Sequence, residues 1–151
     1  YVCNKGIRKK TKRLNNLYDL EKKSGCNNIK YYKNFSKKIK LLKEENLAFL
    51  KKCKKNNKIV YGMGAPVKGN TLLNYFKIDT KLIPILLEKN NLRDGLYSPG
   101  THIPIKMEDN VKKLPDIYYV LAWNFKTEIL KKNKNLIKKG IKFYFPIKVN
   151  D

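Results

Sequence analysis

Apolar side chains recur every three or four residues through 28–55, and lysines occupy most of the remaining positions. The apolar positions are Tyr32, Phe35, Ile39, Leu42, Phe49 and Cys53, interrupted only by Asn46. This period predicts a long amphipathic helix over 28–55, which we expect to pack against a sheet or a neighbouring domain. A weaker pattern in residues 5–25, ending at Ser24-Gly25, predicts a short helix or a linker.

After residue 57, short apolar runs alternate with amphipathic segments. We predict strands at 59–62, 82–87, 103–105, 117–122 and 142–146, and helices at 67–76, 107–113 and 126–138, with a Gly-, Ser- and Pro-rich loop over 90–102. Strands separated by helices favour parallel pairing. The sequence therefore predicts an α/β fold with a doubly wound, mainly parallel sheet, preceded by the long N-terminal amphipathic helix.

The turn after the first predicted strand carries the strongest candidate site. Gly62 and Gly64 end the apolar run, and the predicted helix follows directly. Glycine permits positive φ and close backbone approach, while the first N–H groups of a helix lack partners within it. Such a turn can bind an anion, and Lys68 could supply charge to a diphosphate. A glycine turn without a ligand is the alternative interpretation.

Two known phosphate-loop patterns match this turn only in part. The third glycine of a dinucleotide fingerprint would fall on Val67. In a nucleoside-triphosphate loop, Gly64 and Gly69 would be spaced correctly, but Asn70 replaces the lysine that precedes Thr71. The second departure argues against ATP hydrolysis.

Further candidate residues follow other predicted strands, whose carboxyl ends should meet at one sheet edge. Glu88 follows the second run, where an acidic side chain in a nucleotide-binding fold accepts hydrogen bonds from ribose hydroxyls. A solvated acid at a strand end is its alternative interpretation. Trp123 and Asn124 could contact a base or sugar, although a half-buried tryptophan explains the ring equally simply.

Residues 97–105 combine a turn at Pro99-Gly100 with the hydroxyls of Ser98 and Thr101 and the single histidine, His102. His102 could contact a ligand, but one histidine without an acidic partner defines no catalytic unit. The sequence also lacks a Ser/His/Asp pattern, paired carboxylates and a metal-ligand cluster. We therefore predict no catalytic and no metal-binding residues in this chain.

The formal net charge is +23, and all but three of the 35 basic residues are lysines. Nucleic-acid sites usually favour arginine, and here the lysines are spread through both halves of the chain. We expect only non-specific affinity for nucleic acid. A dedicated lysine-rich module that binds polyanions or nucleic acid is kept as an alternative.

Cys3, Cys26 and Cys53 form neither a Cys-x-x-Cys pair nor a disulfide framework, so we expect reduced thiols. No apolar run approaches the roughly 20 residues that a membrane span requires, and no secretory signal is visible. These features favour a cytoplasmic protein without a membrane partner.

Three separated segments carry a family resemblance: 61–74 (YGMGAPVKGNTLLN), 96–105 (LYSPGTHIPI) and 121–125 (LAWNF). In this order and spacing they resemble the C-terminal domain of S-adenosylmethionine-dependent C-methyltransferases that act on nucleotide-linked deoxysugars. The resemblance covers nearly all of 28–148 and, more faintly, 1–27. It implies a Rossmann-like domain that helps to hold the nucleotide-sugar.

The family also implies an upstream zinc-binding part and an upstream methyltransferase domain that holds S-adenosylmethionine and the catalytic base. Residues 1–27, beginning with the tail Tyr1-Val2-Cys3, would be a linker or short helix from that domain, and 28–151 would be the Rossmann-like C-terminal domain. Residues 1–151 alone should then not transfer methyl groups. Where the family often has aspartate and proline, this chain has Glu88 and Leu92, which keeps the carboxylate but changes the loop.

We thus expect a nucleotide-linked sugar and the upstream methyltransferase domain as partners. A stand-alone Rossmann-like domain that binds another nucleotide is a further alternative. The predicted substrate-binding residues are Gly62, Gly64, Ala65, Lys68, Gly69, Asn70, Thr71, Glu88, Ser98, Gly100, Thr101, His102, Trp123 and Asn124.

Overall fold

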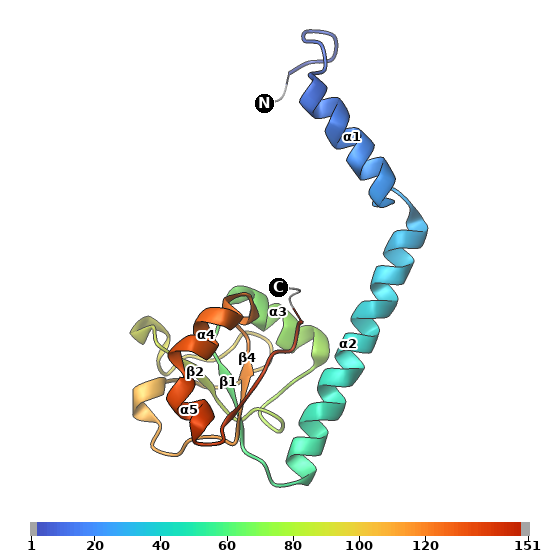
Figure 1. Ribbon diagram of the computed structural model, residues 1–151. Helices are drawn as coiled ribbons and strands as arrows, with labels where there is room; N and C mark the ends of the chain where they lie inside the picture. Colours follow the sequence, from blue (N-terminus) through green and yellow to red (C-terminus); the bar gives the residue numbers. More distant parts are fainter. Residues whose placement is uncertain (1–2, 149–151) are drawn as a thin grey trace. The chain divides into compact units, whose positions relative to one another are not determined.

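The computed structural model describes residues 3–148, so Tyr1 and Val2 of the expected upstream tail lie outside the described residues. The chain divides between Leu41 and Leu42 into two compact units. The first contains α1 (Lys12–Ser24) and the beginning of α2 (Ile29–Lys55) (Figure 1). Both predicted N-terminal helices are therefore present, and α2 agrees closely with the expected 28–55.

Capping groups define both ends of α1. The Thr11 Oγ1 accepts a hydrogen bond from the N–H of Leu14 at 3.3 Å, which satisfies one of the free donors of the first turn. Gly25 ends the helix with φ 73°, a conformation that glycine adopts without a steric cost. No α1 side chain is buried within the described part of the chain.

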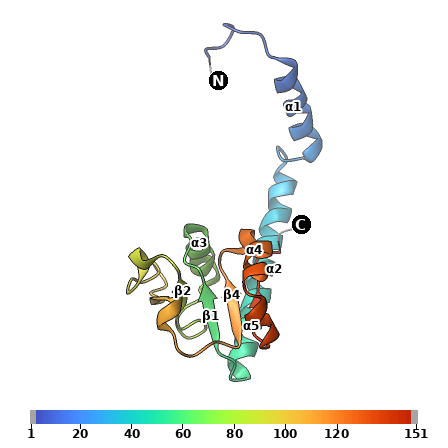
Figure 2. The same ribbon diagram turned by 60° about the vertical axis from the view of Figure 1, so that its left-hand side comes forward.

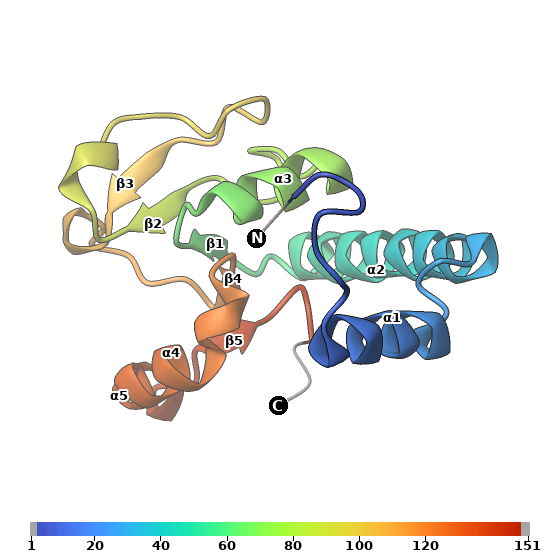
Figure 3. The same ribbon diagram turned by 90° about the horizontal axis from the view of Figure 1, so that it is seen from above.

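The second unit is built on a five-stranded parallel sheet. Its strands are β1 (Val60–Met63), β2 (Leu86–Glu88), β3 (Ile105–Met107), β4 (Ile117–Val120) and β5 (Lys142–Tyr144), in the spatial order β3-β2-β1-β4-β5 (Figure 3). In the register Gly62 lies beside Leu86 on one side and Tyr119 on the other. This order, reversing between β1 and β4, is that of a Rossmann-like sheet and confirms the predicted fold class.

Helices cover both faces of the sheet (Figures 2 and 3). The C-terminal part of α2 and α3 (Val67–Phe76) lie on one face, where their side chains share a core with inward residues of β1, β2 and β4. Helices α4 (Lys126–Lys132) and α5 (Lys134–Lys138) lie on the other face, over a second apolar cluster that contains Tyr118 and Val120. Burial on both faces explains why β4 is apolar throughout. No helix among residues 3–148 has the length and apolarity to cross a bilayer.

Several predicted boundaries were wrong, for local reasons. Only the last part of the 82–87 run is a strand, since the N–H groups of Leu82 and Ile83 bond Asp79 in a turn and Pro84 has no N–H. The helix predicted at 107–113 is a single 3₁₀ turn, η2 (Glu108–Asn110). The helix predicted at 126–138 breaks at Asn133, whose side chain donates to the Ile129 carbonyl at 2.8 Å.

Asn46, which only interrupted the apolar pattern, is a buried anchor of α2. Its side-chain amide donates to the carbonyls of Leu42 at 2.8 Å and Pro146 at 3.1 Å. Its Oδ1 accepts the hydroxyl proton of Tyr119 at 2.7 Å. The residue is only 1% exposed, so these bonds replace the water it has lost. They join α2, β4 and the segment after β5.

We expect Tyr119→Phe to lower the free energy of unfolding by about 1–2 kcal/mol, because it leaves the buried Oδ1 of Asn46 without a donor. Burial raises the pKa of Tyr119 well above its ordinary value, so its hydroxyl remains a donor at all ordinary pH. Urea unfolding would measure the change. Tyr144→Phe is the matched control, since the Tyr144 hydroxyl makes no hydrogen bond among residues 3–148. An equal loss of stability in both variants would show that the hydrogen bond between Tyr119 and Asn46 does not stabilise the fold.

Candidate functional site

Three parallel strands end at the edge where the strand order reverses. The glycine turn follows β1, Glu88 ends β2, and the 3₁₀ turn η3 (Trp123–Phe125) follows β4. In open α/β sheets this reversal creates a crevice in which ligands bind. The structure thus brings together three segments that are 24 or more residues apart in sequence and that were each predicted to carry site residues.

The glycines of the first turn have different structural roles. Gly64 has φ 80°, a conformation that disfavours other residues, and its N–H donates to the Leu87 carbonyl at 2.8 Å. A Cβ on Gly62 would collide with the side chain of Leu86, and one on Gly69 would lie 2.8 Å from the Cβ of Leu121. Gly62 and Gly69 therefore allow close packing, whereas Gly64 permits the turn itself.

Lys68 and Trp123 lie together beside the start of α3. The Lys68 Nζ is 5.7 Å from the centroid of the Trp123 ring, within the range of a cation–π contact. Pro66 occupies the N-cap position, directly before the first helical residue. Its backbone is extended, and it supplies no side-chain hydrogen bond to the helix. Lys68 is exposed and Trp123 half-buried, so both can reach a ligand at the mouth of the turn.

Glu88 reaches back from β2 and holds the glycine turn. Its Oε2 accepts from the N–H of Ala65 at 3.1 Å and from the Arg93 guanidinium at 3.0 Å. Its Oε1 accepts from the N–H of Lys89 at 2.8 Å and of Asn90 at 3.4 Å. A carboxylate has about four acceptor sites, and all four are used here.

These bonds set the charge state of Glu88. Burial by itself would raise the pKa of the carboxyl, but the N–H donors of Lys89, Ala65 and Asn90 and the charge of Arg93 outweigh it, and the pKa lies below its ordinary value. Arg93 also donates to the Ala65 carbonyl at 2.7 Å. Arg93 was not predicted from the sequence as a site residue, although an arginine is rare among so many lysines and this rarity was the available signal.

The loop over 97–105 folds through its own polar groups. Ser98 is 3% exposed, and its Oγ accepts from the N–H of Ile103 at 2.9 Å and lies 2.6 Å from the Thr101 hydroxyl. Gly100 has φ 79° and packs so closely on Asn74 that a Cβ would collide with it. Asn74 in turn donates to the Pro99 carbonyl at 2.9 Å, which docks the loop on α3.

Between this loop and α3 lies a cleft of only about 30 Å³, room for about one water molecule. Ala65, Asn70 and Ser98 are among its lining residues. The Oδ1 of Asn70 is buried there and has no hydrogen-bond partner in the part of the chain that the structure describes. On the α3 side, the crevice is therefore nearly filled.

A larger cavity of about 310 Å³ opens at the same edge on the α4 side, a size that suits a small ligand. Gly64 and Glu88 line it, together with residues that the sequence analysis did not predict, chiefly Glu108, Phe125, Glu128, Ile129 and Asn133. At its rim Lys132 pairs with Glu128 at 2.7 Å and Lys89 with Glu108 at 3.4 Å. Carboxylates and an amide of this kind can accept hydrogen bonds from hydroxyl groups.

Ten of the fourteen predicted residues lie at four places near the sheet edge. The larger cavity contains Gly64 and Glu88, the small cleft Ala65, Asn70 and Ser98, the mouth of the turn Lys68 and Trp123, and the packed positions Gly62, Gly69 and Gly100. Thr101 belongs to the loop network, while Thr71, His102 and Asn124 are exposed. No group of three His, Cys, Asp or Glu side chains within 3–148 could hold a metal ion, and all three cysteines are free.

Comparison with known proteins adds two findings. The family model described as "C-methyltransferase C-terminal domain" matches residues 1–148. The chain is also 29% identical over 128 residues to a C-methyltransferase, NovU, of Streptomyces niveus; the alignment covers 84% of this chain and 30% of that protein. The match therefore spans less than a third of the length of that relative.

Proposed function

This chain belongs to the C-methyltransferase C-terminal domain family, and from that premise we propose that it is the nucleotide-sugar-binding domain of an S-adenosylmethionine-dependent sugar C-methyltransferase. The observation that carries the proposal is the cavity of about 310 Å³ at the carboxyl edge, lined by Gly64 and Glu88 and adjacent to the turn that leads into α3. A cytoplasmic location belongs to the same proposal.

In the proposed complex, the free N–H groups at the start of α3 and the charge of Lys68 bind the diphosphate. The ring of Trp123 stacks on the base, and the sugar hydroxyls donate to the carboxylates of Glu108 and Glu128 in the cavity. Glu88 acts indirectly: since its four acceptor sites are used within the fold, it shapes the turn instead of binding a ribose.

The chemistry itself is assigned to the rest of the enzyme. S-adenosylmethionine would supply the methyl group as a sulfonium, after deprotonation beside the carbonyl of a ketosugar. The residues described here do not fit either implied cofactor: no three metal-ligating side chains cluster, and the acid that would hold a ribose is fully engaged. In this proposal zinc, S-adenosylmethionine and the base belong to upstream parts of the enzyme, and residues 1–151 alone should not transfer methyl groups.

A titration of this chain with a thymidine-diphosphate sugar, beside NAD and ATP, tests the proposal. We expect the sugar nucleotide to bind most tightly, and Lys68→Ala with Asn70→Ala to weaken it by about tenfold or more. Asn135→Ala with Lys139→Ala removes the same charge from an exposed part of the other sheet face and serves as the control. Equal, salt-sensitive binding of all three ligands, unchanged by the first pair, would contradict a specific site and favour the polyanion-binding alternative.

The cavity and the turn can be tested separately with thymidine diphosphate and its sugar conjugate. The double variant Glu108→Gln with Glu128→Gln should weaken binding of the sugar conjugate by about threefold to tenfold. Binding of thymidine diphosphate should not change, because only the sugar reaches the cavity. The Lys68 and Asn70 variant should weaken both ligands. An equal loss of affinity for both ligands in the double glutamine variant would show that the sugar does not occupy the cavity.

A further inference from the structure

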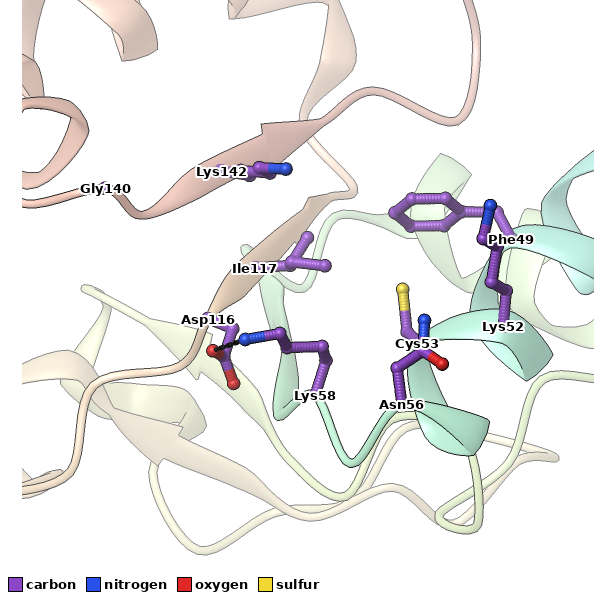
Figure 4. Close-up of a pocket in the computed structure, with 9 residues that line it drawn as sticks. All are labelled: Phe49, Lys52, Cys53, Asn56, Lys58, Asp116, Ile117, Gly140 and Lys142. Carbon is purple, nitrogen blue, oxygen red and sulfur yellow. Dashed lines mark hydrogen bonds and ion pairs between the residues drawn. The ribbon is translucent and has the colours of Figure 1, made fainter.

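A second cavity, of about 350 Å³, lies at the opposite, amino-terminal edge of the sheet (Figure 4). The end of α2 contributes Phe49, Lys52, Cys53 and Asn56, and the strand starts contribute Lys58, Asp116, Ile117, Gly140 and Lys142. All of these residues belong to the second unit. Its volume falls within the range of small-molecule pockets.

The cavity carries an excess of positive charge. Lys58 and Asp116 form an ion pair at 2.9 Å, and Asp116 also accepts the N–H of Ile59 at 2.8 Å. The hydrogen bond from Lys58 is the main reason why the pKa of Asp116 lies below its ordinary value. Within residues 3–148, no carboxylate pairs with Lys52 or Lys142. Lys52 and Lys142 therefore add two positive charges to the exposed part of the lining, and neither has a counter-charge there.

Phe49, Cys53 and Ile117 form the apolar part of the lining. The Phe49 ring is fixed by stacking on Tyr144, with ring centroids 3.7 Å apart. Figure 4 shows the sulfur of Cys53 pointing into the space between Phe49 and Ile117. Burial raises the pKa of the Cys53 thiol, which therefore stays neutral and adds no negative charge to offset the lysines.

The end of α2 does not cancel this charge. A helix C-terminus carries partial negative charge, mostly on its last unpaired carbonyls. Here the Cys53 carbonyl accepts from the N–H of Lys58 at 2.9 Å, and those of Lys52 and Lys54 accept from Asn56 and Asn57 at 3.1 and 3.0 Å. Because these carbonyls are bonded, the two lysine charges dominate.

From this combination we infer that the cavity binds a small organic anion, a carboxylate attached to an aromatic or aliphatic body. The carboxylate lies between Lys52 and Lys142, and its apolar body fills the space beside Phe49, Cys53 and Ile117. The cavity is too small for a whole nucleotide-sugar and lies at the other edge of the sheet. It is therefore a second site, independent of the proposed function.

Benzoate is a suitable probe, because it combines a carboxylate with one ring. In amide NMR titrations of this chain, we expect benzoate to shift the signals of Cys53, Ile117 and Gly140, with a Kd of about 1 mM or below. Benzyl alcohol has the ring without the charge and inorganic phosphate has the charge without the ring, so both should bind at least about threefold more weakly. Shifts spread over exposed lysines, or equal binding of either control ligand, would overturn the inference.

The double variant Lys52→Gln with Lys142→Gln should weaken the binding of benzoate by about tenfold. The matched control is Lys51→Gln with Lys138→Gln, which removes the same charge from exposed positions outside the cavity. If both double variants lost the same benzoate affinity, the anion would be attracted only by the general positive charge of the chain, and the inference of a site would be wrong. Thymidine diphosphate should not displace benzoate; if it did, the two ligands would share one site and the inference would be wrong.

Discussion

Replacement of Gly69 by valine should lower the free energy of unfolding by about 3 kcal/mol and should also abolish nucleotide-sugar binding. A Cβ at this position would lie 2.8 Å from the Cβ of Leu121 and 3.2 Å from the Cγ of Pro66. Leu121 is fully buried, and neither contact atom is the free end of a flexible side chain. Helix α3 would have to move away from the end of β4, and its first N–H groups would lose their position.

A graded series separates this steric effect from helix propensity. In an exposed helix, Gly→Ala stabilises by up to about 1 kcal/mol, but Gly69→Ala should destabilise, because its clash exceeds that gain. Thr71→Val keeps a β-branched side chain at an exposed position of the same helix and should change stability by less than about 0.5 kcal/mol. Urea unfolding and the sugar-nucleotide titration measure both effects. A stable Gly69→Val that still binds would show that α3 is not seated closely on β4.

The sequence was sufficient to predict elements whose cause is local. The apolar period gave α2 almost to its ends, and the alternation of runs and helices gave five parallel strands and their shared edge. Gly64 illustrates the same point at the site, since the apolar run that it ends and the helix that follows were enough to predict a turn with positive φ there.

Features that depend on distant contacts were not predictable. Asn46 looked like an interruption because its partners, Tyr119 and Pro146, are 73 and 100 residues away. Gly69 looked like part of a phosphate loop, but the space it leaves is defined by Leu121. The larger cavity takes Glu108 from η2 and Glu128, Ile129 and Lys132 from α4, and the boundaries of these two elements depend on hydrogen bonds that no pattern reveals.

The second large effect should come from Glu88. Glu88→Ala is expected to lower the free energy of unfolding by about 3 kcal/mol, since it removes the acceptor of three backbone N–H groups and leaves the Arg93 guanidinium, only 38% exposed, without its counter-charge. The turn that holds Gly64 and Ala65 would lose its connection to β2. We therefore expect weaker binding of the sugar nucleotide as well.

The pH dependence of stability shows whether Glu88 holds the turn through its charge or only through the packing of its side chain. The pKa of Glu88 is lower in the folded chain than its ordinary value of 4.5, so its contribution to stability is complete above that pH and is lost as the pH falls through the folded pKa. Glu88→Gln keeps the size of the side chain but does not titrate, and its loss of stability relative to the native chain should shrink below pH 4.5. Glu44→Gln, at an exposed position of α2, should follow the native curve.

Arg93→Met completes the test, because it removes the charge while keeping much of the side-chain volume. If Glu88 and Arg93 act as one unit, the double variant Glu88→Gln with Arg93→Met should cost less than the sum of the two single changes, by about 1 kcal/mol or more. Additive losses, or a Glu88→Gln curve parallel to the native one between pH 3 and 7, would mean that the carboxylate does not hold the turn. Glu88 would then be available to a ligand, and the ribose-binding role expected from its place at the end of β2 would regain support.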